Sequence, residues 1–299
     1  MNIFKSFFKK KNIIKNNIDS KNKYPLSGNL VYHYNERPRS SIIINHYTSL
    51  KTLLKTIKNL RVLGDEVEII VINDSKKNSD KISRSLSHSN DKLIVTQDLG
   101  EIRGYKNGAN LSSSSDFLIF SQDDDLAPNN ANWYNDCLRL FEEDPKLALI
   151  GLCGGGCFLT QENEINFQRH KLSSKYDKFY CSWLKIGPLI IKKNIYFEIG
   201  EWDLYSNIGE SAHFIDPDLT IRIWKNGYKA VLFLNKNTLQ WQRRYQRGDQ
   251  LTKEKIVKRN LNDPVYFLNK DKYIAKNKIY FKDVEEKVLF ENKKIGVTY

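Results

Sequence analysis

Three consecutive carboxylates, Asp123 to Asp125, follow directly after a strongly apolar run in the segment QDDDLAP (122–128). Neighbouring carboxylates repel one another unless a cation or water screens them. A hard divalent ion such as Mg²⁺ or Mn²⁺ binds carboxylate oxygens together with substrate phosphates, so this segment is suited to hold a diphosphate through a metal. A solvated acidic turn before the next helix is the alternative, which Pro128 and Asn129 favour.

Polar residues also follow two other apolar runs. Asn45, His46 and Tyr47 come after the first run, and residues 73–75 (Asn-Asp-Ser) come after the second. In open α/β sheets the ligand binds beyond the carboxyl ends of the strands. We therefore expect the three polar ends to converge on one crevice.

Strand and helix signals alternate from Ser40 onward, and these elements must position the polar side chains. Runs rich in Ile, Leu and Val predict strands, and apolar residues at helical spacing predict a helix that Ser49 caps and Gly64 ends. The predicted strands are 41–45, 68–74, 93–98, 116–121 and 147–152, and a further helix is predicted around 133–142. Because alternating strands and helices form right-handed βαβ units, the predicted fold class is α/β, with a mostly parallel, Rossmann-like sheet flanked by helices.

Six segments, taken in order, resemble glycosyltransferase family 2, whose members have the GT-A fold and use nucleotide sugars. They are IIINHYTS (42–49), VINDS (71–75), RGYKNGAN (103–110), FLIFSQDDDLAP (117–128), GPLIIKKNIYFEIGEWD (187–203) and IDPDLTIRIWKNGY (215–228). The resemblance covers about residues 41–234. We expect a basic N-terminal tail (1–37), one GT-A-like catalytic domain (38–245) and a polar, basic C-terminal extension (246–299).

The resemblance implies roles for individual residues. Asp74 would recognise a uracil-type base, and Asp216 would be the general base that deprotonates the acceptor hydroxyl. The nucleotide-sugar donor would be bound by His46, Tyr47, Asp74, Arg103, Lys106, Asp123 and Asp124, and the metal, Mn²⁺ or Mg²⁺, by Asp124 and Asp125. Asp216 followed by Pro217 is also a good helix N-cap, and both roles can coexist.

The chain departs from the family pattern at three places. The DxD motif of the family aligns either with Gln122 to Asp124 or, one residue on, with Asp123 to Asp125, so we expect Asp124 nearest the metal and keep its neighbours as alternatives. An acidic pair before the helix appears as Ile215-Asp216, with one acid only. Gln240 and Gln242 lie where a late His often assists the metal. An inactive relative therefore remains an alternative.

Composition narrows the class of protein. The chain has 299 residues, 40% of them hydrophobic, which excludes disorder as the main state, and no apolar run approaches the ~18 residues that a membrane span needs. Four Cys do not make a disulfide scaffold. We expect a cytoplasmic protein.

The formal net charge of +13 is concentrated at the two ends of the chain. Residues 1–23 combine Lys with Ile and Phe, so they are either a solvated tail or a short helix that contacts an anionic membrane surface. The charge also suits a basic nucleic-acid-binding protein, but no nucleic-acid-binding motif appears. A nucleotidyltransferase is a further alternative, but the chain lacks the Gly-rich phosphate loop that such an enzyme would need.

The predicted function is transfer of a sugar from a nucleoside-diphosphate donor, UDP-linked, to a hydroxyl of a glycan or glycolipid. The resemblance implies an inverting, metal-assisted reaction that contributes to polysaccharide biosynthesis.

Overall fold

The structure, a computed structural model, describes residues 37–97, 99–152, 156–159, 164–166, 176–202, 215–243 and 280–297, all within one compact unit (37–299). The segment predicted to contact a membrane, residues 1–23, lies outside the described residues, so that hypothesis stays a prediction. In the described ranges, no helix is both long enough and apolar enough to cross a bilayer.

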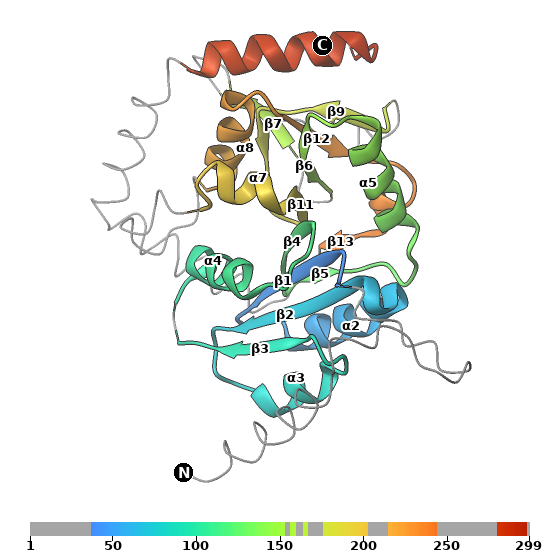
Figure 1. Cartoon of the computed structure of the whole chain (residues 1–299), viewed down its shortest axis with the longest axis vertical. Helices are drawn as coiled ribbons and strands as arrows, with labels where there is room; N and C mark the ends of the chain where they lie inside the picture. Colours follow the sequence, from blue (N-terminus) through green and yellow to red (C-terminus); the bar gives the residue numbers. More distant parts are fainter. Residues whose placement is uncertain are drawn as a thin grey trace, which may run out of the picture. The chain divides into compact units, whose positions relative to one another are not determined.

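The elements alternate between strands and helices along most of the chain (Figure 1). The first half contains β1 (Ser40–His46), α2 (Leu50–Leu60), the 3₁₀ turn η1 (Arg61–Glu66), β2 (Val67–Asn73), α3 (Ser79–Ser85), β3 (Lys92–Val95), α4 (Glu101–Leu111), β4 (Phe117–Gln122), β5 (Asp125–Leu126), α5 (Asn132–Glu143) and β6 (Leu147–Gly151). The second half contains β7 (Gly156–Leu159), β8 (Glu164–Asn166), β9 (Lys178–Tyr180), β10 (Trp183–Leu184), β11 (Leu189–Lys192), α7 (Lys193–Glu198), α8 (Ile215–Lys225), β12 (Lys229–Phe233), η3 (Thr238–Gln240) and β13 (Gln242–Arg243). A last helix covers 280–294.

Eight strands form the central sheet in the order β3-β2-β1-β4-β11-β6-β12-β9. The strands β1, β2, β3 and β4 pair in parallel, β6 pairs in parallel with β12, and β11 lies antiparallel between β4 and β6. All five predicted strands are confirmed, as β1, β2, β3, β4 and β6, and so is the mostly parallel α/β fold. Continuous apolar runs predict such strands well because both faces of the sheet are buried.

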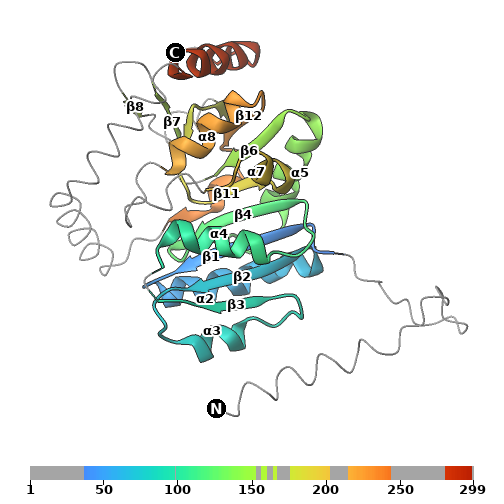
Figure 2. The ribbon, with the colours of Figure 1, turned by 60° about the vertical axis from the view of Figure 1, so that its left-hand side comes forward.

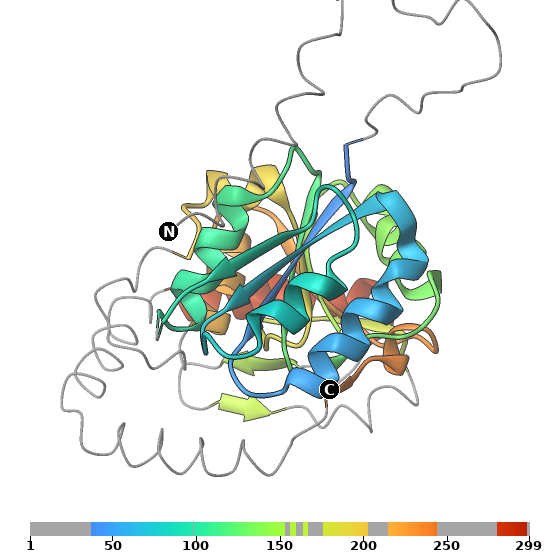
Figure 3. The same ribbon diagram turned by 90° about the horizontal axis from the view of Figure 1, so that it is seen from below.

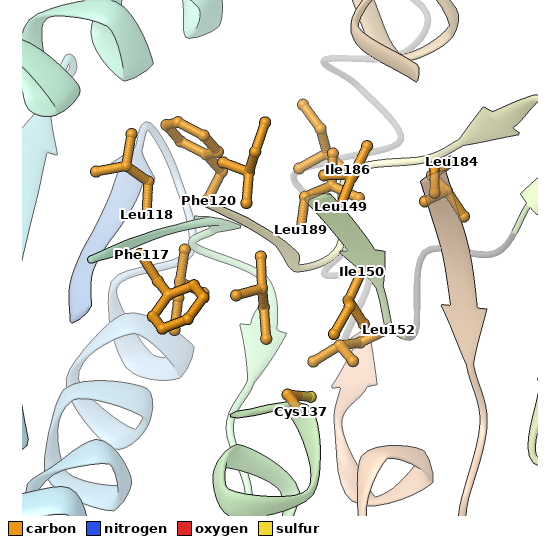
Figure 4. Close-up of a cluster of buried hydrophobic side chains, with 14 of the residues drawn as sticks. Phe117, Leu118, Phe120, Cys137, Leu149, Ile150, Leu152, Leu184, Ile186 and Leu189 are labelled. Atoms are coloured by element: carbon orange, nitrogen blue, oxygen red, sulfur yellow. The ribbon is translucent and has the colours of Figure 1, made fainter. Parts of the chain in front are cut away.

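Helices cover both faces of this sheet. Helices α2 and α5 lie on one face and α4 and α7 on the other (Figures 2 and 3). Phe117 and Phe120 of β4 point to opposite faces of the sheet. The ring of Phe117 stacks on that of Phe141 in α5, with 4.9 Å between the ring centroids. The ring of Phe120 packs on that of Trp202, beside α7, with 4.4 Å between the centroids. Figure 4 shows the same alternation, with Phe117 and Phe120 on opposite sides of β4 and Cys137 of α5 on the Phe117 side.

The helix 280–294 packs against the β9 edge of the sheet. The side chain of Asn292 is buried, accepts a hydrogen bond from the backbone N–H of Tyr180 at 2.7 Å and donates one to its carbonyl at 2.9 Å. Val284 and Val288 belong to the main hydrophobic core. Asn292 thus satisfies backbone groups of an edge strand that would otherwise be open to another chain.

The segment 103–110 forms part of helix α4, although it contains two glycines. Gly104 and Gly108 lie one turn apart and face β1 and β2. A Cβ atom on Gly108 would lie 2.4 Å from Ile43 Cγ2, whereas a Cβ atom on Gly104 would lie 3.1 Å from Asn45 Oδ1. The glycines therefore allow α4 to approach the sheet closely.

We expect Gly108→Ala to lower the free energy of unfolding by about 1–3 kcal/mol, because the new methyl group overlaps the buried side chain of Ile43. The gain in helix propensity, about 1 kcal/mol, opposes this cost only in part. Urea denaturation measures the change. Asn107→Ala, on the exposed side of the same helix, is the control and should be slightly stabilising. A Gly108→Ala variant as stable as the control would contradict the close approach.

Candidate functional site

The polar ends of three strands lie next to one another at the carboxyl edge of the sheet. Strand pairing places His46 opposite Asn73, and Asn45 opposite Gln122. The convergence expected from the sequence is therefore confirmed. The acidic segment that follows Gln122 is adjacent to the turn that follows His46.

Two helices begin at the same edge. Helix α4 starts at Glu101, and the N–H of Gly100, just before it, donates to Asp74 at 2.9 Å. Helix α8 starts at Ile215 and leads into β12, which runs parallel to β6 and in the same direction as β4. A helix that precedes a parallel strand begins at the carboxyl edge of the sheet. The backbone of Asp216 is thereby placed at this edge.

Asp123 joins the acidic segment to the turn after β1. One of its carboxylate oxygens, Oδ2, lies 2.7 Å from His46 Nδ1 and accepts hydrogen bonds from the N–H groups of Tyr47, Thr48 and Ser49 at 2.9, 2.9 and 2.7 Å. The prediction that Ser49 caps α2 with its side chain is wrong, since its hydroxyl has no hydrogen-bond partner among the described residues. Asp123, in the turn after β4, instead accepts from the backbone of the segment that precedes α2.

Burial alone would raise the pKa of Asp123, but hydrogen bonds from His46 and from the backbone of Ser49 and Tyr47 outweigh that effect and lower it. The unfolded chain has the ordinary Asp pKa of ~3.9. A folded pKa below this value means that Asp123 stabilises the fold above pH ~3.9, and that this contribution is lost as the pH falls through the folded pKa.

Asp125 is fully buried and paired with an arginine from the end of the domain. Arg243 Nε lies 3.1 Å from Asp125 Oδ1, and the N–H of Gln122 donates to Asp125 Oδ2 at 3.0 Å. Arg243 also donates to Gln122 Oε1 at 2.7 Å and to the carbonyl of Ile186 at 2.6 Å. Asp125, expected at the metal, is therefore held by protein groups.

Asp124 differs from its two neighbours because it is half-buried, whereas they are buried. The acidic segment thus has two buried carboxylates, Asp123 and Asp125, and one at the margin of solvent, Asp124. Within the described part of the chain, no three His, Cys, Asp or Glu residues are grouped so that they could hold a metal by themselves.

Asp74 is buried beneath the loop between β3 and α4. Its Oδ1 accepts from Thr96 Oγ1 and from the N–H of Leu99, both at 2.7 Å, and its Oδ2 accepts from Gly100. The carboxylate expected to recognise a base thus holds the loop between β3 and α4.

The remaining predicted residues are spread over the edge. His46 is buried and Tyr47 is 50% exposed. Arg103 is exposed on α4, and Lys106 Nζ, farther along that helix, lies 3.8 Å from Glu201 Oε2. The side chain of Asp216 lies outside the described residues.

Two side chains at this edge are not among the site residues that the sequence predicts. They are Arg243 and Glu101, which lies at the start of α4. Glu101 Oε1 accepts from Gln122 Nε2 at 2.7 Å and lies 3.0 Å from the Tyr105 hydroxyl. Burial raises the pKa of Glu101, although the hydrogen bonds from Gln122 and Tyr105 oppose the shift. The partners of Arg243 in the acidic segment are more than 100 residues away, and Glu101 is bonded to Gln122, 21 residues away, so no local pattern marks these contacts.

Comparisons with known proteins identify the family of the chain. The model of glycosyl transferase family 2 matches residues 41–198, more than half of the chain. The chain is 25% identical over 213 residues to the probable glycosyltransferase YdaM of Bacillus subtilis (strain 168), a match that covers 66% of this chain and 49% of the relative. The chain therefore spans about half the length of that relative.

Two solved structures share the fold. The crystal structure of GalNAc-T7 with UDP, GalNAc and Mn²⁺ is 18% identical with a TM-score of 0.52, covering 65% of this chain and 42% of that one. The crystal structure of S. aureus TarS 1-349 is 14% identical with a TM-score of 0.50, covering 66% and 58%. Both likenesses concern the fold, which is of the predicted GT-A type.

Proposed function

The chain belongs to glycosyl transferase family 2 and is a glycosyltransferase, and we propose that it uses a UDP-linked sugar donor. The proposed acceptor is a hydroxyl of a glycan or glycolipid. The proposed transfer proceeds with inversion and with the assistance of a divalent metal. Membership in this family favours an enzyme over a basic nucleic-acid-binding protein. The GalNAc-T7 neighbour, whose crystal contains UDP and Mn²⁺, supports the same combination of ligands here.

One observation carries this proposal: Asp124 is the half-buried carboxylate of the acidic segment, at the edge where β1, β2 and β4 end together. Mg²⁺ is usually held by one or two carboxylates and by substrate phosphates rather than by an all-protein cage. Asp124 with a donor diphosphate is such a set. The residues present therefore fit a metal that is shared with the donor.

Asp124 would hold the metal, and Arg103, exposed on α4, would approach the phosphates. When bound, the metal neutralises the charge that develops on the leaving diphosphate. Tyr47, exposed at the end of β1, would lie against the base, and Asp74 would present the loop at Leu99 and Gly100 to it. Lys106 forms an ion pair with Glu201, and this pair would influence the electrostatic potential beside the donor site.

Asp216, at the start of α8, would take the proton of the acceptor hydroxyl. The start of α8, the helix that leads into the parallel strand β12, supports this role for Asp216. The next acid, Asp218, is buried and bonded to Arg222 at 2.7 Å, so it has a structural partner that a general base does not need.

A thermal-shift comparison of UDP, CDP, GDP and ADP, each with and without Mn²⁺, tests the proposed donor. A ligand that binds only the folded protein raises the melting temperature by mass action. We expect UDP with Mn²⁺ to give the largest shift and UDP alone a smaller one. Equal shifts for all four nucleotides would contradict the choice of base, and no shift with any of them would contradict the nucleotide-sugar donor.

A further inference from the structure

We propose that Asn45, Glu101 and Gln122 form a subsite for two neighbouring hydroxyl groups of the donor, either those of its ribose or those of the sugar that it carries. This inference rests on the proposed function, which places the donor at the ends of β1, β2 and β4. The hydrogen-bond acceptor of the subsite is the carboxylate of Glu101, on α4, rather than one of the aspartates 123–125. None of the three side chains is among the donor-binding residues that the sequence predicts.

The three side chains meet at the first turn of α4. Asn45 of β1 and Gln122 of β4 are direct neighbours in a parallel pair, so their side chains lie on the same face of the sheet. Glu101 Oε1 accepts a hydrogen bond from Gln122 Nε2 at 2.7 Å. A Cβ atom on Gly104 would lie 3.1 Å from Asn45 Oδ1, so the amide of Asn45 lies directly beneath this turn of the helix.

The orientation of the Gln122 amide follows from the charged groups on its two sides. Arg243 can only donate hydrogen bonds, and it donates to Gln122 Oε1 at 2.7 Å. The carboxylate of Glu101 accepts, so the NH₂ group of the amide faces it. One of the two N–H bonds of that group has no partner among the residues that the structure describes. Gln122 is therefore a fixed hydrogen-bond donor beside Glu101, and its oxygen is already engaged.

Glu101 and Asn45 also present polar atoms that the fold does not use. The hydrogen bonds of Glu101, from Gln122 and from the Tyr105 hydroxyl at 3.0 Å, both go to Oε1. Within the described ranges Oε2 has no partner, and it is not enclosed, because Glu101 is only partly buried. Asn45 Oδ1 is enclosed without a partner in the same ranges, whereas Nδ2, at the other end of the amide, is not enclosed. An unsatisfied buried polar group costs the fold free energy and is typical of a functional site.

Two neighbouring hydroxyl groups match this set of donors and acceptors. Each hydroxyl donates one hydrogen bond and can accept others, so one can donate to Glu101 Oε2 while its neighbour accepts from Gln122 or Asn45. Hydrogen bonds to an ionised carboxylate are roughly twice as strong as those between neutral groups. An ionised phosphate only accepts, and Glu101 would repel it. The subsite therefore fits a diol of the donor and not its diphosphate.

Isothermal titration calorimetry of the full chain with Mn²⁺ tests this inference, with UDP, 2′-deoxy-UDP, 3′-deoxy-UDP, UDP-glucose and UDP-N-acetylglucosamine as probes. If the subsite holds the ribose, the wild-type protein should bind UDP roughly ten- to hundredfold more tightly than at least one deoxy analogue. If it holds the transferred sugar, UDP and its deoxy analogues should bind alike, and at least one UDP-sugar should bind more tightly than UDP. Glu101→Gln should reduce the preference about tenfold in either case, because an amide oxygen that accepts from Gln122 and Tyr105 leaves an NH₂ group in place of Oε2.

Glu68→Gln is the matched control. Glu68 is also a buried glutamate that side chains hold, those of Ser41 and Lys92, but it lies near the start of β2, at the opposite edge of the sheet. Its replacement should lower the melting temperature and leave the affinity ratios unchanged, as should any change that acts through stability alone. If Glu101→Gln does not fold, Asn45→Ala removes the second member of the subsite and should reduce the same preference about threefold.

The outcomes separate this inference from the proposed function. A wild-type protein that binds none of the probes would refute the nucleotide-sugar donor, and the inference with it. A wild-type protein that binds UDP, with affinity ratios that neither Glu101→Gln nor Asn45→Ala changes, would refute only the subsite. Equal wild-type affinities for all of the probes would also refute only the subsite.

Discussion

Asp216→Asn should yield a stable protein that binds UDP with Mn²⁺ and transfers sugar roughly 10²–10⁴-fold more slowly than the wild type. Asn cannot accept a proton at neutral pH, so the acceptor hydroxyl would lose its general base. Asp216 is not the N-cap expected from the sequence, since α8 begins at Ile215; Asn removes only a negative charge from the first turn of the helix, so the fold should lose less than ~1 kcal/mol. Donor binding should survive, because the proposed donor site lies at the ends of β1, β2 and β4.

The matched control is Asp218→Asn, two residues farther along α8. Asp218 is 3% exposed and bonded to Arg222, which in turn donates to the carbonyl oxygen of Ile199 at 2.7 Å. Its replacement should lower stability, because it weakens a buried ion pair, and should affect transfer only as far as stability falls. Transfer rates and melting curves of both variants should therefore be measured together.

The two variants distinguish the roles of the two acids. Near-wild-type transfer by Asp216→Asn would show that this residue is not the general base. A loss of transfer confined to a stable Asp218→Asn protein would move the general base to Asp218. Loss of UDP binding in Asp216→Asn would contradict the assignment of donor and acceptor to separate parts of the edge.

Local patterns predicted the elements that are buried on both faces. Strands β1, β2 and β4 are runs of apolar residues, and each ends in the polar residues that gather at the carboxyl edge. Helix α4 was not predicted from periodicity, because glycine is a poor helix former. Gly108 is required by the contact with Ile43, and tertiary packing outweighs its low helix propensity.

The partners of the acidic segment could not be predicted from the sequence. His46 and Asp123 are 77 residues apart, and Arg243 and Asp125 are 118 apart. Only the pairing of β1 with β4 and of β13 with β5 brings them together. The sequence alone therefore predicts three similar carboxylates, whereas the fold gives each of them different surroundings.

Those surroundings lead to a sharp expectation for Asp124→Asn. This variant should lose the Mn²⁺-dependent part of UDP binding and should transfer sugar roughly 10²-fold more slowly or worse, because a metal contributes several kcal/mol of charge stabilisation. Asp124 is half-buried, so its replacement should lower the free energy of unfolding less than replacement of the buried Asp123 does. UDP titrations with Mn²⁺ and with EDTA measure the first effect, and urea denaturation the last.

Asp65→Asn and Asp123→Asn complete the comparison for Asp124. The side chain of Asp65 is 96% exposed in the turn η1, so its replacement controls for the loss of one negative charge and should leave UDP binding unchanged. Asp123→Asn should instead lower stability, because the turn at Tyr47 to Ser49 loses a charged acceptor of its N–H groups. If Asp124→Asn kept both its UDP affinity and its Mn²⁺ dependence, the acidic segment would be a solvated turn, and the metal, if any, would have to be held elsewhere.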